Sequence, residues 1–130
     1  MELIAVLAGS ALGGVARFAL SNAVARRFGE RFPWGTLVVN LSGALLIGIL
    51  VGAVLGHADA APGNLGWHLA VIGFLGSYTT VSSFSLQTLA LLHDRAWRAA
   101  GLNIVLSLGL CLGLAALGFA LGGHLAGRLA

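Results

Sequence analysis

The chain has 130 residues, of which 58% are hydrophobic and only 8% are charged. A soluble domain of this size cannot bury so much apolar surface, so the composition predicts a protein embedded in lipid. The formal net charge of +3 comes from seven arginines and no lysine. Because no basic run with interleaved aromatic residues accompanies them, we expect no nucleic-acid partner, and we expect the arginines to orient helices in a bilayer.

The first apolar stretch predicts a membrane helix over about residues 3–25. A cleaved signal peptide is disfavoured, because the stretch begins with Glu2 instead of a basic region and carries Arg17 in its interior. An arginine at this depth cannot lose its proton, so it must reach an interface, meet an acceptor or face water. Arg17 is therefore a candidate for attracting an anion.

Three further apolar stretches predict helices over about residues 34–56, 67–92 and 99–123. Each is longer than the ~20 residues that cross a hydrocarbon core of ~30 Å. Tryptophans stand near the proposed boundaries, where the indole ring prefers the headgroup layer: Trp34, Trp67 and Trp97. The fold expected is one all-α membrane domain over residues 1–130, with four transmembrane helices.

Two patterns concern the assembly of these helices. Glycines recur four residues apart in the first, second and fourth stretches, which lets helix backbones approach closely. Five arginines stand on one predicted side of the membrane and one on the other: Arg26, Arg27, Arg31, Arg95 and Arg98 against Arg128. This bias predicts that both termini lie outside the cell. Separately, four helices make a thin bundle, which is expected to self-associate.

Polar side chains at membrane depth form two tracks. On the second helix Thr36 and Asn40 are four apart and share a face, and on the fourth Asn103, Ser107 and Cys111 repeat that spacing. One interpretation is interhelical hydrogen bonding alone, worth only about 1 kcal/mol per bond. The second interpretation is a polar pathway, because an unpaired buried amide such as that of Asn40 costs several kcal/mol.

The third helix contains the segment "GFLGSYTTVSSFS", with seven hydroxyl-bearing residues between positions 73 and 85. Its glycines and hydroxyls make a poor continuous helix. Irregular backbone at membrane depth is tolerated only where the freed groups face protein, water or an ion. The segment therefore predicts an ion site, and its groups suit either a hard cation or a small anion.

Several residue types are missing where other functions need them. The four acidic residues all fall at predicted ends or loops, so no embedded carboxylate is available for proton coupling. The four histidines lack metal-ligand spacing, and no Ser, His and acid occur at catalytic spacing. We therefore expect no zinc site and no enzyme. Cys111 is the only cysteine and cannot form an internal disulfide.

Four motifs in order, "GGVARF", "PWGTLVVNLSG", "GFLGSYTTVSSFS" and "NIVLSLGLCLG", resemble those of the CrcB/Fluc family of small bacterial fluoride channels over essentially the whole chain. The resemblance implies an antiparallel dimer in the bacterial inner membrane, with the third helix broken at its centre. It implies two narrow pathways at the dimer interface for passive export of cytoplasmic fluoride. The outer surface of the protein would be in contact with membrane lipid.

The resemblance also implies roles for individual residues. Backbone carbonyls of Gly76 and Thr79 from both subunits would enclose a structural sodium ion. Asn40 would donate to fluoride, Phe84 would offer its ring edge, and Arg17 would lie near a polar vestibule. The remaining residues implied to line the pathway are Thr80, Ser83, Asn103, Ser107 and Cys111.

The chain departs from the family pattern at three positions. Val81 stands where the family has the first of two motif phenylalanines, and Gln87 stands where a glutamate is common. Cys111 stands where the family has the second hydroxyl of the track. Because the arginine bias opposes insertion in both orientations, a homodimer and a heterodimer with a paralogous subunit both stay open. A proton-coupled exporter like the small multidrug resistance proteins and an assembly subunit without transport also stay open as functions.

Overall fold

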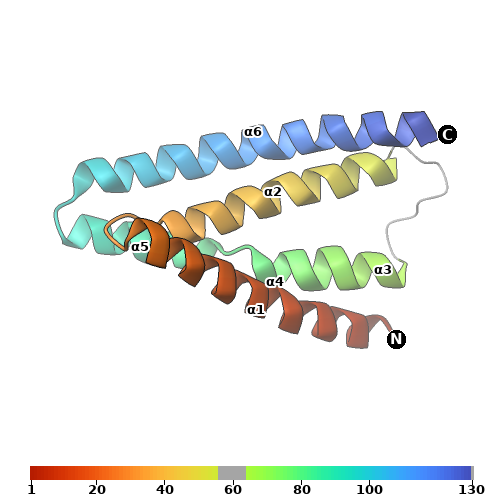
Figure 1. The fold of residues 1–130 in the computed structure, drawn as a ribbon, viewed down its shortest axis with the longest axis horizontal. Coiled ribbons are helices and arrows are strands. Elements are labelled where there is room, and N and C mark those ends of the chain that lie inside the picture. Colours follow the sequence, from red (N-terminus) through yellow and green to blue (C-terminus); the bar gives the residue numbers. More distant parts are fainter. Residues whose placement is uncertain (56–63, 130) are drawn as a thin grey trace.

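The computed structural model describes residues 1–55 and 64–129 as helices with short connections (Figure 1). The first two helices are α1 (Glu2–Phe28) and α2 (Trp34–Leu55). The third span comprises α3 (Leu65–Trp67), the π-helix η1 (His68–Leu75), α4 (Gly76–Tyr78) and α5 (Val81–His93), and the last helix is α6 (Trp97–Leu129). Four spans are long and apolar enough to cross a membrane, as predicted, so this is a multi-pass membrane protein.

The outer two helices extend further than the sequence predicted. The first helix continues past residue 25 because Arg26 and Arg27 occupy its last turn, where cations interact favourably with the helix dipole. It ends at Gly29, whose φ of 83° suits glycine. The fourth continues past residue 123 to Leu129, since no proline interrupts it. The second ends at Leu55, and its expected end at residue 56 lies outside the described residues.

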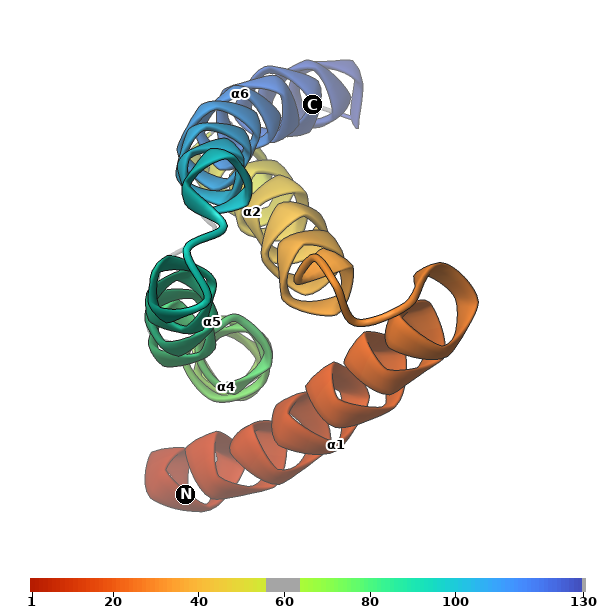
Figure 2. The ribbon, with the colours of Figure 1, turned by 90° about the vertical axis from the view of Figure 1, so that its left-hand side faces the viewer.

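The helices form a slender bundle in which α1 and α6 lie on opposite sides of α2 and the third span (Figures 1 and 2). Both termini lie at one end of the bundle. The connection from α1 to α2 and the turn from α5 to α6 lie at the other end, which therefore collects five of the seven arginines. The charge asymmetry predicted from the sequence is thus an asymmetry between the two ends of the bundle.

Glycines set the two closest helix contacts. A Cβ added at Gly9 or Gly13 of α1 would collide with backbone atoms of Leu69 or Phe74 in η1. Between α2 and α6 the same holds for a set of glycines from both helices: Gly48, Gly52, Gly118 and Gly122. These backbones touch because glycine has no side chain to hold the facing backbone away, as the glycine spacing predicted.

The third span changes geometry twice. Residues 68–75 form a π-helix, which the sequence did not predict. The helix then stops at Thr79 and Thr80, whose backbones are extended, with φ and ψ of −76° and 157° and of −152° and 121°. Thr80 caps α5, because its hydroxyl accepts a hydrogen bond from the N–H of Ser83 at 3.2 Å. The span is therefore two helical segments joined by an extended pair of residues.

The buried core is small and lies next to this extended pair. Val39, Leu75 and Tyr78 form it, and the Tyr78 hydroxyl is hydrogen-bonded to Ser42 Oγ at 2.8 Å. Most large apolar side chains instead lie on the surface, including Val81 at 77% exposure and Leu112 at 71%. Such a surface fits lipid or another membrane chain and does not fit water.

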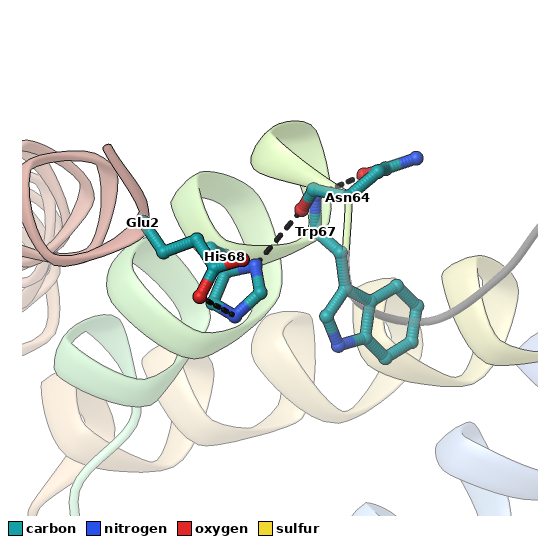
Figure 3. Close-up of polar contacts among 4 residues, drawn as sticks. All are labelled: Glu2, Asn64, Trp67 and His68. Carbon is teal, nitrogen blue, oxygen red and sulfur yellow. Dashed lines mark hydrogen bonds and ion pairs between the residues drawn. The ribbon is translucent and has the colours of Figure 1, made fainter.

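A polar cluster joins the N-terminus of α1 to the start of the third span (Figure 3). The Nε2 of His68 lies 3.7 Å from a carboxylate oxygen of Glu2, and its Nδ1 lies 2.9 Å from the carbonyl oxygen of Asn64. The Asn64 side chain accepts a hydrogen bond from the N–H of Trp67 at 2.8 Å and caps α3. These contacts join α1 to the third span at the end of the bundle that carries the termini.

Candidate functional site

A pocket of about 420 Å³ lies between α2, the third span and α6. We call it the track pocket. Its lining includes seven of the residues predicted from the sequence: Asn40, Gly76, Thr79, Thr80, Phe84, Ser107 and Cys111. The rest of the wall is mainly aliphatic, and Val81 and Leu112 belong to it. One residue of the first polar track, Asn40, and two of the second, Ser107 and Cys111, therefore line the same cavity.

Asn40 holds the extended pair of the third span. Its Nδ2 donates to the carbonyl oxygen of Thr80 at 2.8 Å, and its Oδ1 accepts from the N–H of Thr80 at 2.8 Å. One amide thus replaces the two hydrogen bonds that a continuing helix would give this residue. Nδ2 has two hydrogens, and within residues 1–55 and 64–129 only one of them is used, in the bond to Thr80.

The interruption removes the usual helical partner from two carbonyls. In a continuous α-helix the N–H of Thr80 would donate to Gly76, but here it donates to Asn40. The N–H of Ser83 would donate to Thr79, but here it donates to the hydroxyl of Thr80. The carbonyls of Gly76 and Thr79 therefore both lose the donor four residues ahead. Carbonyl oxygens without a helical donor are the kind of ligand that a hard cation requires.

A second pocket, of about 220 Å³, lies between α1, the first turns of α2 and α5. We call it the arginine pocket, because Arg17 lines it. Two other predicted residues belong to it, Thr80 and Ser83, together with a further polar set: Ser21, Asn22, Thr36 and Gln87. It lies in the half of the bundle nearest the arginine-rich end. Among the described residues, Thr80 alone belongs to the linings of both pockets.

Arg17 and Gln87 bring unpaired polar groups to the arginine pocket. Within residues 1–55 and 64–129, Arg17 makes no ion pair or hydrogen bond, and no acidic side chain is part of this lining. The Oε1 atom of Gln87 is buried and has no hydrogen-bond partner in the same part of the chain. The pocket therefore presents a positive charge without a protein counterion.

Asn103 lies apart from both pockets. It is 2% exposed, and its Nδ2 donates to the hydroxyl of Thr88 at 2.9 Å, which in turn donates to the carbonyl of Phe84 at 2.7 Å. Asn103 therefore joins α6 to α5 within one chain. At this residue the contact matches the interpretation of the polar track as interhelical hydrogen bonding. Sequence reasoning missed its partner Thr88, and the even spacing from Phe84 to Thr88 on one helix face could have indicated it.

Ser21 and Asn22 were also missed. They form a polar pair near the end of the first predicted helix, on the same helix as Arg17, and that position was the available signal. As for metals, no group of three His, Cys, Asp or Glu side chains that could hold an ion occurs in the described part of the chain.

Comparison with known proteins assigns the chain to a family. The model of a family described as CrcB-like protein, Camphor Resistance (CrcB), matches residues 4–119. The chain belongs to the CrcB family. A CrcB relative from Bradyrhizobium diazoefficiens, named fluoride-specific ion channel FluC 2, is 52% identical over 96% of this chain and 91% of its own length.

Two further CrcB relatives carry similar names. Fluoride-specific ion channel FluC 2 of Rhodopseudomonas palustris is 55% identical over 91% of this chain and 90% of its own. Fluoride-specific ion channel FluC of Coxiella burnetii is 42% identical over 96% of this chain and 100% of its own. The resemblance carried by the four motifs is thereby confirmed, and the family is one of ion channels, not enzymes.

Proposed function

We propose that this CrcB-family chain is a fluoride-selective channel that exports cytoplasmic fluoride passively through the bacterial inner membrane. The relatives' names give the ion, and the observation that carries the proposal is the junction at Thr80. An anion attracted by Arg17 reaches Thr80 from the arginine pocket. On the far side of Thr80 it meets the free amide hydrogen of Asn40 in the track pocket.

The track pocket offers weak donors along a mainly apolar wall. Asn40, the ring edge of Phe84 and the hydroxyl of Ser107 bring partial positive charge to an anion without trapping it. Conduction needs this compromise, because an ion bound too tightly does not leave. Neither pocket lining contains an acidic side chain among the described residues, so nothing there supports proton coupling.

We place the structural sodium ion at the interruption of the third span. The carbonyls of Gly76 and Thr79 have lost their helical donors, and two chains together would contribute four such oxygens. Neutral carbonyl oxygens suit a monovalent ion better than a divalent one. The ion, when bound, supplies a positive charge that ties two interrupted helices together.

The pathway is proposed to be completed by a second, antiparallel chain. Val81 and Leu112 belong to the wall of the track pocket, yet their side chains are 77% and 71% exposed in the single chain. A partner would cover this wall and narrow the pocket. The partner is a second copy or a paralogue, since the arginine-rich end biases one orientation.

The test is ion efflux from liposomes containing the purified full-length chain. We expect release of fluoride, followed with a fluoride electrode, at rates far above protein-free liposomes, with no matching release of chloride. Equal chloride efflux would refute selectivity, and no fluoride efflux would refute a self-sufficient channel. A C-terminal tag that a protease removes from about half the molecules in sealed vesicles would support insertion in both orientations.

A further inference from the structure

Two complementary groups in the arginine pocket lack partners. Arg17 offers N–H donors and a full positive charge, and it makes no ion pair or hydrogen bond in the described part of the chain. Gln87 offers an acceptor, since its Oε1 is buried without a partner among the same residues. Both side chains line one cavity of about 220 Å³. An unpaired buried acceptor is destabilising, so a ligand or water must satisfy it.

The charge of Arg17 decides what kind of ligand enters. No carboxylate lines the pocket within residues 1–55 and 64–129, so the guanidinium keeps its charge uncompensated by protein. At membrane depth such a charge attracts an anion more strongly than it would in water. The ligand beside Arg17 is therefore negative.

An anion alone cannot satisfy Gln87, because the amide oxygen and the anion are both acceptors. A water molecule between them resolves the conflict, since it donates one hydrogen to the anion and the second to Oε1. The space suffices, because a cavity of only about 10–15 Å³ holds a water molecule. The cavity of about 220 Å³ therefore has room for a small ion and several waters.

We infer that the arginine pocket binds an anion together with a hydration water that Gln87 holds. The identity of the anion as fluoride rests on the proposed function. In this arrangement the ion keeps part of its hydration beside Arg17 and exchanges it for the amide of Asn40 beyond Thr80. Gln87 acts through the water, so it is a positioning residue whose essential feature is an acceptor oxygen.

Two variants separate the acceptor from the shape of the side chain. Gln87→Met keeps the length and removes the acceptor, whereas Gln87→Asn keeps a neutral amide oxygen and serves as the matched control. Both are purified as full-length protein, checked by size-exclusion chromatography, melted in detergent, and assayed for fluoride efflux from liposomes. We expect Gln87→Met to lose about three- to tenfold in efflux, the range of one hydrogen bond, and Gln87→Asn to lose clearly less, because a water can still bridge to its amide oxygen.

The melting temperature tests whether a water is bound at Oε1 of Gln87, without relying on ion transport. If Oε1 were dry in the folded protein, Gln87→Met would remove a buried unpaired acceptor and raise the melting temperature. With a water bound there, it removes a satisfied group, and the melting temperature stays the same or falls. A higher melting temperature for Gln87→Met overturns the inference, as does equal loss of efflux in both variants. Absence of efflux from the wild type refutes the proposed function instead, and the melting comparison still decides the water.

Discussion

Replacing Asn40 by Asp tests the amide that joins the second helix to the interrupted third span. The carboxylate can still accept from the N–H of Thr80, but it puts an oxygen where Nδ2 now donates to the Thr80 carbonyl at 2.8 Å. Losing that bond and leaving the carbonyl unpaired costs about 2–4 kcal/mol, before any charge repulsion with the ion. Since about 1.4 kcal/mol is a factor of ten, we expect fluoride efflux to fall by at least about 30-fold.

The assay is fluoride efflux from liposomes, with size-exclusion chromatography to verify folding. Asn64→Asp is the matched control: the same substitution stands at an exposed helix cap outside both pockets, where aspartate caps equally well. It should leave efflux unchanged. A folded Asn40→Asp protein that conducts within about threefold of wild type, about 0.7 kcal/mol, would refute the role assigned to this amide.

Four further outcomes follow from the structure. Phe84→Ile keeps bulk but removes the ring edge, so efflux should fall several-fold with an unchanged elution volume. Gly43→Ala places a Cβ against the Cγ2 atom of Thr79, so we expect about 1–3 kcal/mol of destabilisation in a denaturant titration, whereas Gly109→Ala meets nothing within 4 Å and should not destabilise. Glu2→Gln removes the charge of a carboxylate that lies 3.7 Å from His68 and is 69% exposed, so the melting temperature should barely move. Replacing sodium by a large organic cation during purification should lower the melting temperature, and no change would argue against the sodium site.

The sequence predicted the four spans because membrane-crossing length and hydropathy are local properties of the chain. Their ends were less predictable, as the extension of α6 from residue 97 to 129 illustrates. Glycine spacing predicted the close contacts of Gly9 and Gly48, although it could not distinguish them from Gly109, which faces open space. Spacing identifies a face of a helix, whereas only the packed structure identifies what that face meets.

The π-helix of residues 68–75 was not predicted, because no local pattern in its sequence distinguishes it from an α-helix; in the structure it packs against α1 at Gly9 and Gly13. The pairing of Asn103 with Thr88 was also not predicted, since a polar track serves packing and transport equally well. The bidentate contact of Asn40 with Thr80 joins residues forty positions apart. Such long-range contacts exist only after the helices have packed.

The meeting of two cavities at Thr80 has a consequence for kinetics. In the proposed pathway the two chambers are steps in series, so the slower transfer sets the rate of export and the faster one has no effect on it. A substitution that eases passage through the faster chamber leaves the rate unchanged, and two slowing substitutions in different chambers do not multiply. The same sequence change can therefore be silent in one background and decisive in another, according to which side of Thr80 is limiting.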